Sequence, residues 1–245
     1  MTALAMPIQR RPNIRSLARR LKSVILSPVG TATSVFGEHE AVALTFDDGP
    51  DPEVTPRVLS VLRKRNAQAT FFVLTDEAAQ RPELLKRIAD EGHEIGLHFD
   101  RHDRITTLPP KEAFRRMKAA RDSLAALAGR PVTLFRPPYG SQNYQTYAFA
   151  RLLGMRVVGW SQCANDWIEQ SVERSVHDAC HSLAGGDIIL LHDGLVLTPE
   201  ETRPSLDRAE VADGVLAEAQ ARGLRSVTAG VLLQRRPNRF SHWFR

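Results

Sequence analysis

Two adjacent carboxylates and a spaced pair of histidines are the residues of this chain best suited to hold a metal ion. Asp47 and Asp48 directly follow the run Leu-Thr-Phe, and His98 and His102 are four positions apart. One helical turn or a tight loop places imidazoles with this spacing on the same side of the chain. Two imidazoles and a carboxylate from another segment make a three-ligand site with open positions, which is typical of catalytic zinc.

The two neighbouring aspartates are expected to have different roles. Adjacent carboxylates at the end of an apolar strand repel each other and lose hydration. A turn over Asp48, Gly49 and Pro50 explains one acid but not two. Because successive side chains leave a strand in opposite directions, we expect one aspartate to bind the metal and the other to accept a proton from water that the metal activates.

The body of the chain alternates apolar strand patterns with helical patterns. Strands are predicted over 41–46, 69–74, 94–98, 133–135, 156–160, 187–191 and 225–227. Helices are predicted over 55–64, 82–91, 111–127, 147–153, 172–183 and 207–221. This alternation favours parallel βα units, and about seven or eight strands suit a barrel as well as an open sheet.

The chemically capable residues share one position, directly after the predicted strands. They are Asp47, Asp48, His98, Arg136, Tyr139, Asp166 and His192. In a βα barrel, the carboxyl ends of all strands meet at one mouth. We therefore expect residues spread over about 145 positions to converge on a single site.

Basic residues gather at the two ends of the chain. The net charge is +5, but residues 1–37 hold six Lys or Arg and 234–245 hold four, with no acid in either segment. Removing those ten from 33 leaves 23 basic against 28 acidic residues in 38–233, a balance of −5. The chain thus divides into a basic N-terminal segment, a mildly acidic domain over 38–233 and a basic aromatic tail. An acidic domain argues against nucleic acid as a partner.

The N-terminal segment has the pattern of a basic amphipathic helix. Its apolar residues recur at helical spacing, at Ile14, Leu17, Ala18, Leu21 and Ile25. Such a helix packs on the domain edge or attaches to an anionic membrane surface, and the third alternative is a disordered leader. No apolar run reaches the ~20 residues of a membrane span. No signal peptide is seen, so the expected location is the cytoplasm or the inner face of the membrane, with an extracytoplasmic location as the alternative.

Five segments resemble, in order, the motifs of the NodB-type polysaccharide deacetylases, carbohydrate esterase family 4. They are Thr45-Phe46-Asp47-Asp48-Gly49-Pro50, the pair His98 and His102, Arg136-Pro137-Pro138-Tyr139-Gly140, Asp166-Trp167, and Leu190-Leu191-His192-Asp193. One such motif alone is unspecific, whereas five in family order are very specific. The resemblance implies an α/β fold, a distorted and incomplete (β/α) barrel of about seven parallel strands.

The resemblance also implies a metal site and a base. Asp48, His98 and His102 would hold a divalent metal, most simply zinc, with cobalt or another divalent ion as the alternative. Asp47 would be the general base, and Arg136 would orient it and balance its charge.

The remaining motif residues are implied to complete the reaction and bind the substrate. His192 would be the general acid, with Asp166 holding it protonated. The backbone N–H of Tyr139 would stabilise the oxyanion. Three residues would contact the substrate: Trp167, Leu190 and Pro137. The implied substrate is an acetylated glycan, oligosaccharide or lipid-linked sugar, with N-acetyl favoured over O-acetyl groups.

Two positions depart from the family pattern. Phe99 stands where the family has Ser or Thr after the first histidine, and Cys163 replaces the first Asp of the fourth motif. The family hydroxyl steadies the histidine loop, so we expect Asp100 or Asp103 to substitute for it through hydrogen bonds. Neither change removes an implied metal ligand, the base or the acid.

Two other functions are weighed against deacetylation. One is hydrolysis of another non-peptide C–N bond, such as a formamide or cyclic amide, on the same metal site. The other is glycan binding without efficient catalysis, against which the intact set of acidic and histidine residues argues. A retaining glycosidase is disfavoured, because its carboxylates must face each other across a bond rather than point apart.

Overall fold

The structure, a computed structural model, describes residues 30–197, 202–235 and 238–241. The helix expected around 14–25 therefore lies outside the described residues, as does the end of the C-terminal tail. Within the part of the chain that is described, none of the helices is both long enough and apolar enough to cross a membrane.

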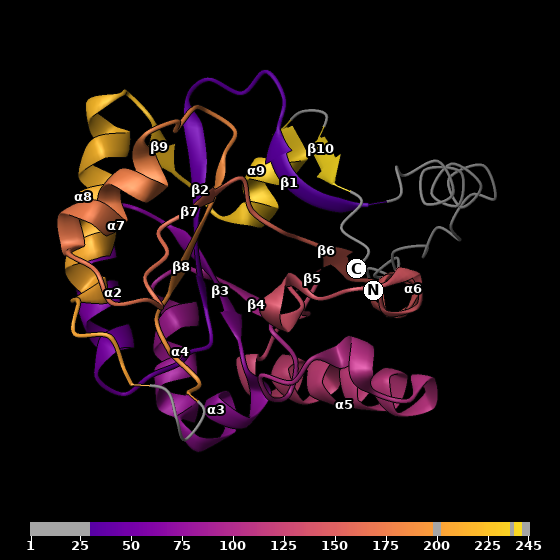
Figure 1. Ribbon diagram of the computed structural model, residues 1–245. Helices are drawn as coiled ribbons and strands as arrows, with labels where there is room; N and C mark the ends of the chain where they lie inside the picture. Colours follow the sequence, from indigo (N-terminus) through magenta and orange to yellow (C-terminus); the bar gives the residue numbers. More distant parts are fainter. Residues whose placement is uncertain (1–29, 198–201, 236–237, 242–245) are drawn as a thin grey trace, which may run out of the picture.

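Seven parallel strands form one curled sheet at the centre of the molecule (Figure 1). They are β2 (Ala41–Asp47), β3 (Ala69–Val73), β4 (Glu94–Leu97), β5 (Leu134–Phe135), β6 (Arg156–Val157), β7 (Gln162–Cys163) and β8 (Ile188–His192). Their order in the sheet is β6-β5-β4-β3-β2-β8-β7, and a short strand, β9 (Arg225–Ser226), pairs with the start of β2. The expected distorted (β/α) barrel of about seven parallel strands is confirmed.

Helices cover the outer face of the sheet. They are α2 (Val54–Lys64), α3 (Thr75–Gln80), α4 (Pro82–Asp90), α5 (Pro110–Ala128), α6 (Tyr144–Leu152), α7 (Val172–Cys180) and α8 (Arg208–Ala221). In Figure 1, α2, α7 and α8 lie along one side of the sheet, while α3 and α5 lie towards its lower end. Most bounds match the sequence prediction within a few residues. Helix α6 begins earlier than expected because Asn143 caps it, accepting hydrogen bonds from the backbone N–H of Gln145 and Thr146.

The strands bury both of their faces. In β2, Val42, Leu44 and Phe46 belong to the cluster between the sheet and the helices. The alternate residues Ala41 and Ala43 belong to a second cluster inside the barrel. Side chains alternate between faces along a strand, so a strand covered on both sides has a nearly continuous apolar sequence.

Two strands lie in the segments that the sequence assigns to the ends of the chain. Strand β1 (Thr31–Val35) pairs antiparallel with β10 (Asn238–Ser241). The N–H of Gly159, after β6, donates to the carbonyl of Ala32, and the N–H of Val35 donates to the carbonyl of Gly186, before β8, both at 2.8 Å. The folded body therefore extends beyond the boundaries 38 and 233 on both sides, and β1 joins the β6 edge of the sheet to the start of β8.

A last helix closes the amino-terminal end of the barrel. Helix α9 (Ala229–Arg235) contributes Ala229, Leu232 and Leu233 to the inner cluster. Its first backbone N–H groups donate to Thr70 Oγ1 and Glu94 Oε2, both at 2.8 Å, near the starts of β3 and β4. The opposite end, where the strands finish, is left for a site.

Candidate active site

The carboxyl ends of the strands surround a cavity of about 500 Å³. Its lining residues come from most of the strand ends: Asp47, Asp48, His98, His102, Arg104, Tyr139, Gly140, Trp160, Trp167, Leu190, His192, Leu195, Val196, Leu197 and Thr202. Three predicted site residues, Arg136, Asp166 and Pro137, are buried and do not line it. The other eight do, so residues distant in sequence converge at one mouth.

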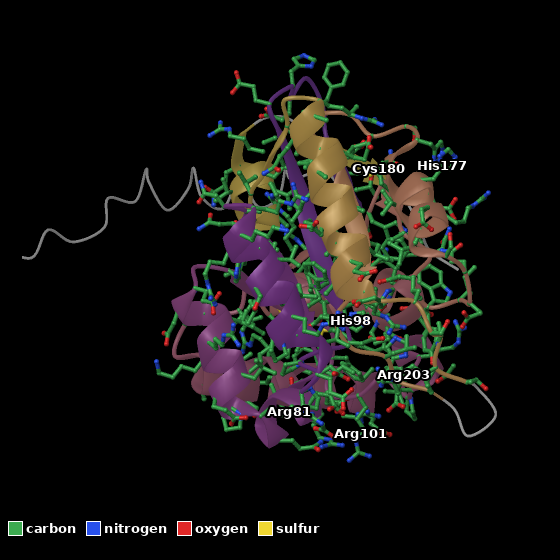
Figure 2. All side chains as sticks on the ribbon, turned by 90° about the vertical axis from the view of Figure 1, so that its left-hand side faces the viewer. Arg81, His98, Arg101, His177, Cys180 and Arg203 are labelled. Carbon is green, nitrogen blue, oxygen red and sulfur yellow. The ribbon has the colours of Figure 1, made fainter. Side chains whose placement is uncertain are left out.

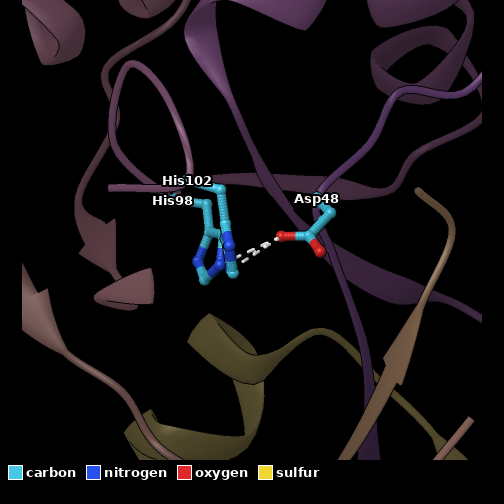
Figure 3. A group of neighbouring side chains, drawn as sticks. All are labelled: Asp48, His98 and His102. Atoms are coloured by element: carbon cyan, nitrogen blue, oxygen red, sulfur yellow. Dashed lines mark ion pairs between the residues drawn. The ribbon is translucent and has the colours of Figure 1, made fainter. Parts of the chain in front are cut away.

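Asp48, His98 and His102 form a group that can hold a metal ion (Figure 3). The Nε2 atoms of His98 and His102 lie 3.3 and 3.4 Å from Asp48 Oδ1. That carboxylate oxygen is buried and has no hydrogen-bond partner within the described chain. A buried acceptor without a donor is destabilising, and a cation about 2.0–2.2 Å from each ligand atom would satisfy it. The residues present thus fit a divalent metal.

A hydrogen bond orients His98, and burial keeps His102 neutral, as metal ligands require. The backbone carbonyl of Arg136 lies 2.8 Å from His98 Nδ1 and accepts its hydrogen bond, which leaves the Nε2 lone pair facing Asp48. Burial lowers the pKa of His102 to about 4, so its imidazole is neutral near neutral pH. Burial would raise the pKa of Asp48, but the imidazoles of His98, His192 and His102 together outweigh it and hold that pKa below its ordinary value.

Asp47 points into the barrel and is held by a buried arginine. Arg136, which is fully buried, donates to Asp47 Oδ1 at 2.7 Å and to Thr45 Oγ1 at 2.8 Å. Its guanidinium also donates to the carbonyl of Gly159 at 2.7 Å and lies over the ring of Phe72. The pair fixes one oxygen of Asp47 and leaves Oδ2 facing the cavity side, 3.8 Å from Nε2 of the first histidine.

His192 is coupled to a buried carboxylate. Its Nδ1 lies 2.7 Å from Asp166 Oδ1, and its backbone N–H donates to Asp166 Oδ2 at 2.8 Å. Arg208 donates to the backbone carbonyl of Asp166 at 3.1 Å. Burial alone would lower the pKa of His192, but Asp166, with smaller contributions from Asp48 and Asp47, raises it to about 9. This imidazole is therefore protonated near neutral pH.

The predicted substrate residues differ in their positions. Trp167 packs edge-on against His192, with ring centroids 5.3 Å apart, and Leu190 points inward from β8, so both line the cavity. Pro137 is buried and does not reach it. Tyr139 adopts a left-handed conformation, with φ 58° and ψ 12°, and its ring lies 4.2 Å from the ring of His102.

An arginine steadies the loop between the two histidines. Arg116 donates to both carboxylate oxygens of Asp100, at 2.7 and 2.8 Å, and to Asp103 Oδ2 at 2.5 Å. Its guanidinium also lies 4.9 Å from the ring centroid of Phe99, the residue that replaces the family hydroxyl. Asp100 and Asp103 thus hold the loop, as expected, but through Arg116.

Several residues of the site were not singled out from the sequence. Arg104, Trp160, Thr202 and the segment 195–197 line the cavity. The rule that polar residues follow strands could have found Arg104, two positions after the second histidine, but nothing local marks Trp160. Asp193, which the sequence offered only as the end of the fifth motif, does not line the cavity; it accepts a hydrogen bond from Thr55 Oγ1 at 2.5 Å, and burial raises its pKa to about 7.

Comparison with known proteins decides the family. Residues 37–158 match the family described as polysaccharide deacetylase. The chain is 34% identical over 215 residues to a peptidoglycan-N-acetylglucosamine deacetylase of Bacillus cereus, which covers 85% of this chain and 96% of that relative. This chain belongs to the polysaccharide deacetylase family.

Other polysaccharide deacetylases agree in sequence and in fold. A chitooligosaccharide deacetylase of Azorhizobium caulinodans is 34% identical over 170 residues, which cover 69% of this chain and 81% of the relative. A solved peptidoglycan N-acetylglucosamine deacetylase, in complex with a naphthalenyl N-oxidanyl-benzamide, superposes with a TM-score of 0.75 at 31% identity, covering 84% of this chain and 93% of the other. The family expected from the sequence is confirmed, and it places the chain among the carbohydrate deacetylases, a class of hydrolases.

Proposed function

We propose that this chain is a metal-dependent deacetylase that hydrolyses the acetamide of N-acetylated sugars in a glycan. The observation that carries the proposal is the unpartnered, buried Asp48 Oδ1 facing two imidazole Nε2 atoms. Beside it stands a second carboxylate, and a protonated imidazole lines the same cavity. A metal site with a base and an acid at its edge is the arrangement that amide hydrolysis needs.

Different residues of the chain carry out different steps of the hydrolysis. Bound at Asp48, His98 and His102, a divalent metal would polarise the acetyl carbonyl and lower the pKa of water. Asp47 accepts the proton of the attacking water on Oδ2, while Arg136 donates a hydrogen bond to Oδ1 and fixes the direction of the carboxylate. The backbone N–H of Tyr139 stabilises the developing oxyanion.

The amine of an amide is a poor leaving group, and His192 supplies the proton that it needs to depart. An amine departs only after it has gained a proton, and the imidazole carries one because its pKa is raised to about 9. After His192 has given its proton to the amine, water from the solvent reprotonates the ring, and the carboxylate of Asp166 favours that protonated state. Trp167 and Leu190 form the apolar wall against which the acetyl methyl and the sugar face pack.

Zinc is the metal we propose, with cobalt as its functional substitute. Two imidazoles and one carboxylate are ligands that zinc prefers, and three protein ligands leave positions open for water and substrate. The names of the relatives support peptidoglycan-like or chitin-like N-acetylglucosamine chains as substrates.

We also propose that the basic ends bring the enzyme to an anionic membrane surface, where a lipid-linked sugar would be its substrate. Support comes from the ten Lys and Arg residues, without an acid, in 1–37 and 234–245. Each cation near such a surface adds about 1 kcal/mol of attraction. The full chain should then bind vesicles containing anionic lipid in low salt and release them in high salt. Equal binding by a variant with the six basic residues of 1–37 changed to Gln would contradict the role of that segment.

Release of acetate tests the central proposal. The zinc-loaded chain is incubated with N-acetylglucosamine oligomers, and mass spectrometry follows the loss of one acetyl group per sugar. The same oligomers carrying N-formyl groups test the alternative C–N substrate. No loss of acetyl from any oligomer by the metal-loaded chain, together with loss of formyl, would replace deacetylation by deformylation.

A further inference from the structure

One cation at the cavity has no role in the hydrolysis described above. Arg104 is exposed and lines the cavity, and its guanidinium carbon lies 4.2 Å from the centroid of the Tyr139 ring. Its backbone carbonyl is fixed by Thr107, which donates to it from N–H at 3.0 Å and from Oγ1 at 2.8 Å. The base of this side chain is therefore held in place, while its charged end reaches over the mouth.

The acids that could neutralise Arg104 are already engaged. Asp100 and Asp103, on the same loop, are both bound by Arg116, and Asp76 beside the loop is bound by Arg101. Within 30–197, 202–235 and 238–241, no carboxylate forms an ion pair with Arg104. It is also the one Lys or Arg among the described residues that line the cavity.

Stacking on an aromatic ring prepares a guanidinium for an anion. The guanidinium carbon of Arg104 lies over the Tyr139 ring, and the N–H donors of a guanidinium lie in its own plane. Two of these N–H groups are parallel and match the two oxygens of a carboxylate or a phosphate. The Tyr139 ring also contacts the His102 ring at a tilt of 51°, with centroids 4.2 Å apart, so Arg104 and the metal ligand His102 flank the same aromatic side chain.

We propose that Arg104 is the anion-recognition residue of this enzyme. It binds a carboxylate or phosphate group carried by the glycan beside the acetylated sugar, and it makes acidic glycans better substrates than neutral ones. This inference rests on the proposed deacetylase function, because the anion is presented by the same molecule whose acetamide reaches the metal.

The test compares matched substrates on four proteins. Neutral N-acetylglucosamine oligomers are compared with oligomers of equal length in which alternate sugars carry a carboxylate, and with oligomers that carry a terminal phosphate. The proteins are wild type, Arg104→Gln, Arg104→Lys and Arg101→Gln. Arg101 is the matched control, because it stands three positions away at the outer edge of the same end of the molecule but pairs with Asp76 (Figure 2).

Loss of the paired N–H donors of Arg104 should lower activity on acidic substrates alone. In Arg104→Gln, kcat/KM should fall about tenfold on the preferred acidic oligomer and change by less than about twofold on the neutral one. Arg104→Lys should recover more activity on a phosphate than on a carboxylate, because an ammonium cannot make two parallel bonds. Arg101→Gln should keep the wild-type preference. Whichever acidic oligomer shows the larger loss identifies the source of the anion.

Two results would overturn the inference. Equal losses on neutral and acidic oligomers in Arg104→Gln would mean that the residue only supports Tyr139. An equal kcat/KM of wild type on all oligomers would remove the preference itself. Calorimetric binding of the same oligomers by metal-free protein is the readout independent of turnover. Binding of the acidic oligomer that Arg104→Gln abolishes, without acetate release by wild type, would reject the deacetylase proposal and retain the anion site.

Discussion

The Asp166→Asn substitution tests the acid side of the mechanism most directly. Asp166 is completely buried, and its carboxylate contacts His192 twice, through Nδ1 at 2.7 Å and the backbone N–H at 2.8 Å. Asparagine keeps the shape and can still accept one of these hydrogen bonds. What it removes is the negative charge that outweighs the burial of the imidazole.

The size of the effect follows from the position of His192. Its pKa of about 9 lies well above the ordinary value of 6.5, chiefly because of Asp166. At pH 8, an imidazole with a pKa of about 9 is protonated in roughly 90% of molecules, and one with a pKa of 6.5 in about 3%. Without the charge of Asp166, the fraction of His192 in the acid form at pH 8 should therefore fall by roughly 30-fold.

The assay is the pH profile of kcat/KM on an N-acetylglucosamine oligomer. In wild type, activity should fall as pH rises through the raised pKa of His192, because the acid form is lost on deprotonation. In Asp166→Asn, this alkaline limb should move to lower pH. A bound metal would act on His192 in both proteins alike, so the comparison between them isolates the charge of Asp166.

Asp178→Asn is the matched control for this experiment. The carboxylate of Asp178 accepts a hydrogen bond at 3.1 Å from Asn165, the residue that precedes Asp166 in the sequence. Asp178 has no hydrogen bond to His192, so the substitution removes a nearby charge without touching the general acid. Its alkaline limb should stay in place. An unmoved limb in Asp166→Asn, or the same movement in both variants, would refute the coupling of Asp166 to the general acid.

Four further predictions concern the metal and the groups around it. Treatment with a chelator should abolish activity, and zinc or cobalt should restore it; full activity of a metal-free preparation would contradict the assignment. Asp47→Asn should bind zinc but release no acetate, whereas Asp48→Asn should also lose zinc affinity, and equal zinc loss would show the roles to be wrong. Arg136→Gln should lower the free energy of unfolding in urea by about 3–5 kcal/mol, since a buried carboxylate loses its partner; an unchanged midpoint would refute this pairing. Arg116→Gln should weaken zinc binding about tenfold by freeing the histidine loop, while Arg115→Gln on the same helix should not.

The sequence predicted the barrel because its signals are local and repeated. Apolar runs such as 41–46 and 69–74 are followed by turns and helices, and each unit indicates a strand without knowledge of the others. The same periodicity predicted that polar strand ends would meet. Residues far apart in sequence line one cavity for that reason, and the motif resemblance added their roles.

The rest of the fold depends on long-range contacts that have no signature in the local sequence. Strand β1 pairs with β10 across some 200 positions, and its residues 31–35 show neither alternation nor a hairpin turn. The strand expected over 156–160 ends at Val157, because Val158 pairs with Ala32 and the chain then crosses towards β7. Arg116 was equally hidden, because nothing in a helical sequence tells which charged side chain reaches the carboxylates of a distant loop.

The backbone at the mouth carries a feature that no side-chain pattern reveals. Among the described residues, five that are not glycine have a positive φ, and four of them follow strand ends around the cavity: Asp48, Phe99, Tyr139 and Asn165. A left-handed backbone at a bulky residue is costly and persists only where surrounding contacts impose it. Here each such residue turns the chain sharply at the point where a strand finishes. At Asp48 the turn lets the carboxylate face the two histidines while its neighbour points into the barrel. At Phe99 it separates the two histidines, and Arg116 supplies the contacts that hold it. The backbone therefore sets the different directions in which adjacent residues of the site point, and the contacts of the barrel have to support these strained conformations.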